Sequence, residues 1–163
     1  MTLREQLEAK KRRKAVVPVL VSDATEDGNQ LAAYQHAHAL AVEAGRDADA
    51  ALLLVDIEDQ VAKVRAHWVD VELVALPPAE WEAAVAAWQT IQVQDDGPTA
   101  VIDWTEGLPH LLALSCTDES MNDPEVWKTL ITGGAWNEGE VDSLKRAILH
   151  LNVDAADPHV PKG

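Results

Sequence analysis

The stretch WVDVELVA at positions 68–75 carries the clearest structural signal in this sequence. Its odd-numbered positions are all apolar, whereas two of its even-numbered positions are acidic. Side chains on a β-strand point alternately to opposite faces, so this pattern predicts a strand with one buried face. We expect the indole of Trp68 to lie on the polar face, together with Asp70 and Glu72.

A second strand is predicted at positions 15–22, where AVVPVLVS is rich in valine. Pro18 restricts this strand to an edge or an end of a sheet, because proline has no N–H to donate. Two separate strands are marginal in water, so we expect 15–22 and 68–75 to pair antiparallel with each other. The free edges of such a pair would be open to a neighbouring chain.

Positions 30–66 connect the two strands and are rich in alanine without any proline. Apolar residues recur there at alternating steps of four and three, which is typical of amphipathic helices. The two apolar stripes are Ala33, Ala37, Leu40 and Ala44, and then Ala50, Leu54, Ile57, Val61 and Val64. Gly45 lies where this periodicity breaks and is a typical residue at a helix C-terminus. The pattern predicts a helical hairpin, and one continuous helix is the alternative.

The sequence after position 75 is predominantly helical. A proline pair at 77–78 precedes a predicted helix on which Trp81, Val85 and Trp88 share one face. We expect a loop at 91–103, in preference to a weak hairpin, because DDGP at 95–98 is rich in turn-forming residues.

These elements predict an α+β protein, mostly α, with a small antiparallel β pair connected by a helical hairpin and followed by a C-terminal helical subdomain. Thr2 and Glu5 have the spacing of a capping box, which predicts a short N-terminal helix running to Lys14. The expected segments are a basic N-terminal arm or helix at 1–14, a strand–hairpin–strand–helix subdomain at 15–90, the loop at 91–103, a helical subdomain at 104–152 and a disordered tail at 153–163.

Charge is distributed unevenly: 13 Lys and Arg residues stand against 28 Asp and Glu residues, a formal net charge of −15. Six basic and two acidic residues lie in positions 1–14, so this arm carries +4 and the rest of the chain −19. An acidic body repels nucleic acid and anionic membranes. No apolar stretch approaches the ~20 residues of a membrane span. One cysteine allows no intramolecular disulfide, so we expect a cytoplasmic protein.

No catalytic or metal-binding pattern is visible in the sequence. His36 and His38 are two positions apart, so on a helix they point away from each other and cannot share a metal ion. Cys116 follows the apolar stretch LLALS at 111–115, which indicates a buried structural thiol in preference to a nucleophile. The glycines match neither a phosphate-binding loop nor a dinucleotide fingerprint. We therefore expect no enzymatic activity, no metal ion and no cofactor.

The chain contains six Trp, one Tyr and no Phe. Trp is enriched among the residues that anchor protein interfaces. We expect Trp81, Trp88, Trp127 and Trp136 to contribute to the core and Trp68 to be exposed. Glutamates flank several of these indoles, which favours contacts with protein over stacking on nucleic acid. The candidate partner-binding residues are Trp68, Asp70, Glu72 and Trp81, together with Lys10, Lys11, Arg12 and Arg13 of the arm.

Several segments follow one another in a characteristic order. They are LREQL at 3–7, KKRRK at 10–14, VPVLVS at 17–22, VELVALPPAEWE at 71–82, WNEGE at 136–140 and LN at 151–152. In this order they resemble tail assembly chaperones encoded in the tail-gene modules of actinobacterial siphophages. The resemblance implies a protein that binds the long helical tape measure protein, and sometimes the tail tube subunit, during tail assembly in the host cytoplasm. It implies no catalytic residues.

Two other functions remain open at this point. A virion structural protein of the tail or connector would use the basic arm and the sheet edge for contacts within a ring, as a homo-oligomer. A small acidic regulator would bind nucleic acid through the basic arm, although the charge of −19 on the rest of the chain opposes it.

Overall fold

The computed structural model describes residues 1–153, and the fold is α+β and mostly α, as predicted. The predicted tail at 153–163 lies outside the described residues from position 154 onward. In chain order the elements are α1 Leu3–Glu8, β1 Lys14–Leu20, α2 Thr25–Glu43, α3 Asp47–Ala66, β2 Trp68–Val74, α4 Pro78–Ala87, β3 Gln89–Gln94, β4 Gly97–Ile102, α5 Trp104–Ser115, a 3-10 turn Glu119–Met121, α6 Pro124–Thr132 and α7 Glu138–Asn152.

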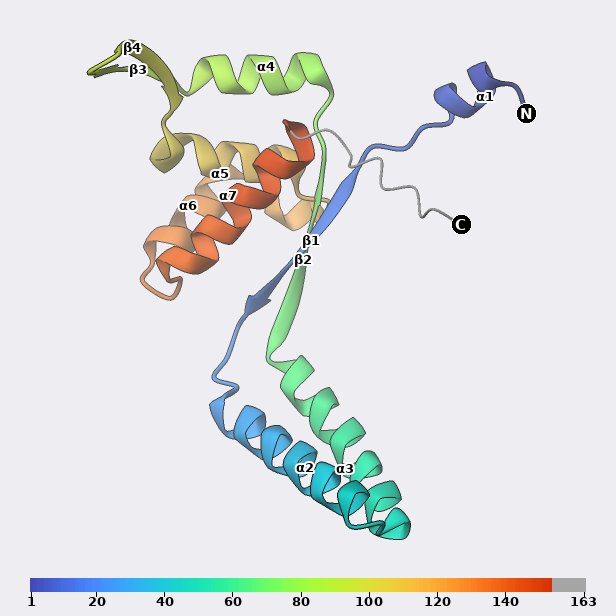
Figure 1. Ribbon diagram of the computed structural model, residues 1–163. Coiled ribbons are helices and arrows are strands. Elements are labelled where there is room, and N and C mark those ends of the chain that lie inside the picture. The colour runs from blue at the N-terminus through green and yellow to red at the C-terminus, as the bar shows by residue number, and fades with distance from the viewer. Residues whose placement is uncertain (154–163) are drawn as a thin grey trace. The chain divides into compact units, whose positions relative to one another are not determined.

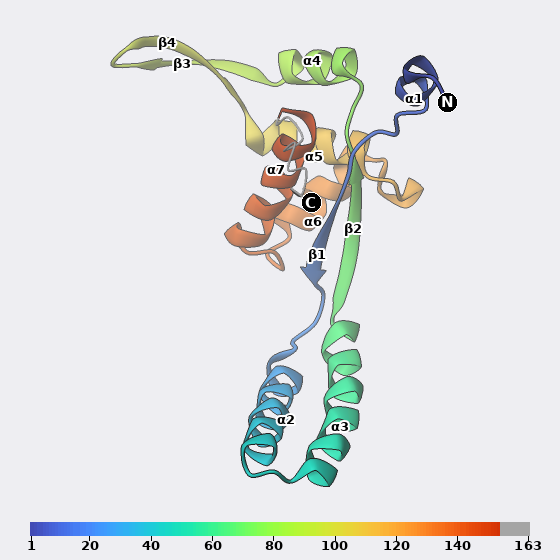
Figure 2. The ribbon, with the colours of Figure 1, turned by 45° about the vertical axis from the view of Figure 1, so that its right-hand side comes forward.

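The strands β1 and β2 form an antiparallel pair, which confirms the pairing of the two predicted strands. The N–H of Val21 donates to the carbonyl of His67 at one end, and the N–H of Ala75 donates to the carbonyl of Arg13 at the other. Figures 1 and 2 show the two strands running side by side. The helices α2 and α3 are therefore an insertion between the two strands of one pair.

The chain divides into two compact units, and both divisions fall inside the strand pair. One unit is Pro18–Asp70, which we call the hairpin unit. The other comprises Met1–Val17 and Val71–Gly163 and is called the helical unit. The segments expected from the sequence instead have their boundaries after positions 14, 90, 103 and 152.

The hairpin unit consists mainly of α2 and α3, which pack against each other as antiparallel neighbours (Figures 1 and 2). Gly45 lies between them with φ of +67°, a conformation that glycine adopts without steric cost. The predicted helical hairpin is thus confirmed, and the continuous helix is wrong.

The contact between α2 and α3 buries small side chains. Ala41 and Ala50 are the buried apolar residues of the two described helices, and Gln60 is buried with them. Of the predicted apolar stripe on α3, Ala50 is buried and Ile57 and Val64 are half-buried, whereas Leu54 and Val61 remain 49% and 47% exposed. The hairpin therefore leaves most of its larger aliphatic side chains at the surface.

The helical unit holds most of the core. Trp127 is 1% exposed, and its indole N–H donates to the carbonyl of Met121 over 2.8 Å. The N–H of Leu76 donates to the Asn152 side chain, which connects the end of β2 to the end of α7. The buried apolar residues of this unit include Val17, Leu73, Leu76, Leu108, Leu111, Leu112, Ala113, Trp127, Leu144, Ile148 and Leu151.

The predicted loop at 91–103 is wrong, because β3 and β4 form an antiparallel hairpin there. Gln89 pairs with Ile102, and Gln94 pairs with Gly97. Asp95 and Asp96 thus form a two-residue turn, and Gly97 follows with φ of +115°. The residues that suggested a loop are those that make this tight turn possible.

Two further expectations need correction. The N-terminal helix α1 ends at Glu8 and does not reach Lys14, since β1 already begins there. Of the four tryptophans expected in the core, Trp127 is buried, whereas the other three are half-buried. The three are Trp81, Trp88 and Trp136.

The two faces of α5 provide a test of this core. We predict that Leu112→Ala lowers the free energy of unfolding by about 2–5 kcal/mol, because it leaves a cavity where a fully buried side chain was. Leu114→Ala is the matched control on the same helix, where the side chain is 54% exposed, and should change it by less than about 0.5 kcal/mol. Urea denaturation measures both, and equal effects would contradict the burial of Leu112.

Candidate protein-binding groove

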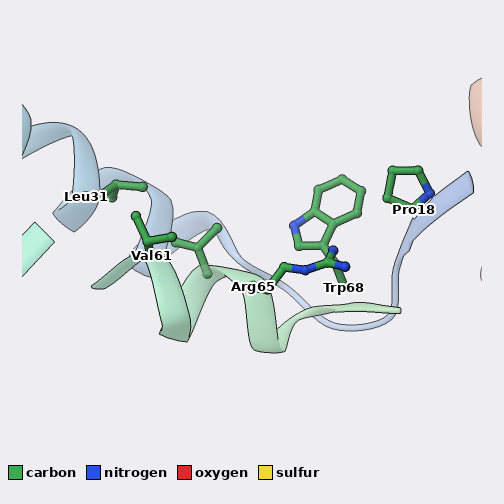
Figure 3. A pocket seen from close by; sticks show the side chains of 6 residues that line it. Pro18, Leu31, Val61, Arg65 and Trp68 are labelled. Carbon is green, nitrogen blue, oxygen red and sulfur yellow. The ribbon is translucent and has the colours of Figure 1, made fainter. Parts of the chain in front are cut away.

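An apolar groove of about 310 Å³ lies within the hairpin unit, where α2 and α3 meet the strand pair. Its lining comes from β1, α2, α3 and the start of β2. Figure 3 shows the side chains in order along the groove, from Leu31 at one end to Pro18 at the other. The lining residues are Pro18, Leu31, Val61, Val64, Arg65 and Trp68.

Helical spacing explains how the sequence builds the long wall of this groove. Val61, Val64 and Arg65 are three and four positions apart, so they share one side of the last two turns of α3. Trp68 follows one turn later as the first residue of β2 and is 37% exposed. Arg65 forms an ion pair with Asp70, which keeps a cationic side chain beside an otherwise apolar lining. Trp68 is thus exposed, as expected, and its side chain lines the groove.

A hydrogen-bond network lies at the same junction of the hairpin unit. The hydroxyl of Ser22 is 2.7 Å from His67 Nδ1, and His67 Nε2 is 2.8 Å from Asp27 Oδ2. The Gln60 side-chain amide donates to Asp27 Oδ1 over 2.8 Å and to the Asp27 carbonyl over 3.0 Å. These four residues join the end of β1, the first turn of α2 and the last turns of α3. Hydrogen bonds from His67 and Gln60 lower the pKa of Asp27.

The contacting groups of Ser22, His67 and Asp27 are of the types found in hydrolytic triads. Nucleophilic catalysis additionally requires oxyanion donors and a substrate cleft at the serine. The groove of this unit is lined by other residues. The contacts of this network connect the end of β1 and the first turn of α2 to the last turns of α3, segments that are far apart in the sequence.

The two acidic candidates have different partners. Asp70 pairs with Arg65 in the hairpin unit, next to the groove. Glu72, in the helical unit, lies 2.8 Å from Lys14 Nζ, and the Thr117 hydroxyl donates to the Glu72 carbonyl. The Lys14 ammonium and Thr117 lower the pKa of Glu72. Glu72 therefore belongs to the strand pair itself and does not line the groove.

The other candidates are distributed over the helical unit. Trp81 is half-buried on α4 and is not among the residues that line the groove. Lys10, Lys11 and Arg12 are fully at the surface between α1 and β1, whereas a guanidinium nitrogen of Arg13 lies 3.2 Å from His150 Nε2. Of the candidates named from the sequence, the structure places Trp68 in the groove and Asp70 on the arginine that lines it.

Pattern reading did not connect Ser22, Asp27, Gln60 and His67. The geometry of the predicted hairpin could have indicated these contacts. With a turn near Gly45, the residues just after β1 lie opposite the residues just before β2. Ser22 and His67 are almost equally distant in sequence from this turn, as are Asp27 and Gln60 within a few residues.

Within residues 1–153, no three His, Cys, Asp or Glu side chains come together as potential metal ligands. Among the helices of that same part of the chain, none has the length and apolar character required to cross a membrane. No protein-family profile, curated protein sequence or solved structure matches this chain.

The lowered pKa of Asp27 predicts a pH-dependent contribution to stability. A carboxyl group whose pKa is lower in the folded state stabilises the fold at pH values above its ordinary pKa. This contribution is lost as the pH falls through the lowered folded-state pKa, because the group then becomes protonated in both states. The Tm difference between wild type and Asp27→Asn should therefore be largest near neutral pH and should disappear in strong acid.

Calorimetric scans at a series of pH values measure this difference. Asp59→Asn is the control, because Asp59 is an exposed residue of α3 for which no hydrogen-bond partner is found in the described part of the chain. Identical pH profiles for the two variants would contradict a stabilising role of the Ser22–His67–Asp27–Gln60 network.

Proposed function

We propose that this protein binds a helical segment of another protein through the groove at Trp68. The single observation that carries this proposal is the open apolar lining of the groove on a hairpin that buries few large side chains. Apolar surface exposed to water is costly, and contiguous exposed patches mark interaction sites. A groove between two helices accommodates an amphipathic helix more readily than a flat surface does.

The open side of α3 has the periodicity of a helix-packing seam. Leu54 and Val61 are spaced by seven residues on α3 and are 49% and 47% exposed, and Trp68, the first residue of β2, follows seven positions later and is 37% exposed. A seven-residue spacing keeps side chains on one face over several turns, as in coiled coils. The side of α3 that contacts α2 is used within the hairpin, so this neighbouring face is available to a third helix.

Charge favours a particular kind of partner. Residues 18–70 contain three Lys and Arg residues and ten Asp and Glu residues, a net charge of −7. Such a surface attracts a basic or neutral amphipathic helix and repels polyanions. It supports a protein client over nucleic acid, and hence disfavours the regulator that would use the arm to bind DNA.

The resemblance to siphophage tail assembly chaperones indicates which protein we propose as the client. The client is then the tape measure protein, a long and largely helical protein, and the interaction takes place in the host cytoplasm during tail assembly. In this proposal the protein holds apolar faces of its client without any chemical step, so no enzymatic activity is needed.

One observation favours a structural subunit of the virion as a second candidate. The hairpin of β3 and β4 exposes Ile91 and Val93 to 74% and 85%. A two-stranded hairpin with open edges can add strands from a neighbouring subunit. A subunit of this kind would be retained at fixed copy number in finished particles, whereas a chaperone would be absent from them.

Truncation of Trp68 tests the proposed function. An interface-anchoring Trp typically contributes 2 kcal/mol or more to binding, so Trp68→Ala should weaken client capture ~30-fold or more. The measurement is co-expression with the tape measure protein encoded nearby, followed by size-exclusion chromatography and titration of the purified complex. Circular dichroism should show unchanged helix content in the variant.

Trp136→Ala is the matched control, because Trp136 is a half-buried indole of the helical unit outside the groove. It should leave capture unchanged. If neither wild type nor control binds the client, and the protein is instead found at fixed copy number in finished particles, the chaperone proposal is wrong and the structural subunit replaces it.

A further inference from the structure

The hairpin of β3 and β4 has two outer edges that differ in their hydrogen-bonding groups. The N–H of Asp103 donates to the carbonyl of Trp88, and this pair continues the register of the hairpin beyond its last pair, Gln89 and Ile102. Hydrogen-bonded and non-hydrogen-bonded pairs alternate in an antiparallel ladder, so the odd-numbered residues of β3 direct their N–H and C=O groups outward. On β4 the outward residues are Pro98, Ala100 and Ile102.

Pro98 obstructs the β4 edge, whereas the β3 edge is open. Proline has no N–H to donate, and natural edge strands carry proline or charged side chains that prevent pairing with other chains. The outward residues of β3 are Gln89, Ile91 and Val93, and their backbone N–H groups have no hydrogen-bond partner in the described part of the chain. Every residue of β3 is exposed. The β3 edge is therefore available to pair with a further strand.

We propose that the β3 edges of two copies of this chain pair antiparallel about Ile91 and form a symmetric dimer with a four-stranded sheet. Ile91 of one copy then lies opposite Ile91 of the other, and Gln89 lies opposite Val93. This register pairs the outward N–H and C=O groups of all three residues on both edges. The pairing requires neither a client nor a finished particle, so it stands or fails independently of the proposed function.

The distribution of charge permits this contact between two acidic chains. Neither β3 nor β4 contains a Lys, Arg, Asp or Glu residue, so no like charges meet across the paired edges. The acidic pair Asp95 and Asp96 lies in the turn. In the antiparallel register the two turns lie at opposite ends, and eight residue steps place Asp95 of one copy about 27 Å from Asp95 of the other. This separation exceeds the Debye length of about 8 Å in physiological salt.

The side chains of β3 match those of a second β3 in this register. The apolar Ile91 meets its own copy, and on the opposite face Thr90 lies opposite Gln92, whose amide is a hydrogen-bonding partner for a hydroxyl. A helical client cannot replace this strand, because the backbone groups of a helix are bonded within the helix. Four strands are more stable than an isolated two-stranded hairpin. Pro98 at the outer β4 edges opposes the addition of further copies.

Sedimentation of the full-length protein over about 1 µM to 1 mM tests the dimer. We expect a monomer–dimer equilibrium that Ile91→Pro weakens about tenfold or more, because each copy loses its central outward N–H while the bonds within the hairpin remain. Ala100→Pro is the matched control, since Ala100 is paired with Ile91 in the hairpin but lies on the obstructed edge, and it should leave the equilibrium unchanged. A monomer at all concentrations, or equal effects of the two variants, overturns the proposal.

Charged variants at position 91 test the register without a change in the backbone. Ile91→Lys places two cations opposite each other in the dimer, and Ile91→Glu places two anions there, so each variant alone should dimerise weakly. An equimolar mixture of the two should associate about threefold or more tightly than either alone, because opposite charges then face each other.

The control for the register is the corresponding mixture of Val93→Lys with Val93→Glu, because position 93 lies opposite Gln89 and not opposite itself. Its members should associate no more tightly in the mixture than alone. If mixing gives no gain at position 91, or an equal gain at position 93, the proposed pairing about Ile91 is wrong.

Discussion

The pairing of β1 with β2 is the constraint on which the rest of this structure depends. Hydrogen bonds hold Val21 to His67 and Arg13 to Ala75, so the intervening chain must leave one strand and return to the other. Two antiparallel helices of 19 and 20 residues with a turn at Gly45 satisfy this requirement. On the side of the helical unit, the N–H of Thr117 donates to the Glu72 carbonyl, which connects the end of α5 to β2.

The composition of the hairpin determines what this insertion can do. Ala41 and Ala50 are the buried apolar residues of α2 and α3, and small residues bury little apolar area. The larger aliphatic residues, such as Leu54 and Val61, consequently face outward. The Ser22–His67–Asp27–Gln60 network provides hydrogen bonds in a unit that buries few large apolar side chains. The hairpin unit is thus fixed by polar bonds and open along an apolar groove, which supports the proposal that it binds a helix of another chain.

Charge differs between the hairpin unit and the N-terminal arm. The hairpin unit is acidic, whereas the cations of the arm lie close together in the sequence, ahead of β1. Lys14 forms an ion pair with Glu72 within the strand pair, whereas Lys10, Lys11 and Arg12 have no ion-pair partner among residues 1–153. Basic and apolar side chains adjacent on one short segment provide both attraction at a distance and contact at close range.

The amino-acid sequence by itself determined the strands β1 and β2, the helical hairpin and the surface position of Trp68, because alternation, helical periodicity and glycine placement are local properties. It also indicated a turn at Asp95 and Asp96, although not the strand pairing on either side, since pairing depends on partners further along the chain. Only the tertiary structure decided which residues meet Trp68 and which bind His67. Leu31 and Val61 are 30 positions apart and line one groove because two helices pack antiparallel. A local sequence pattern spans only a few residues, so it cannot indicate a contact over this separation.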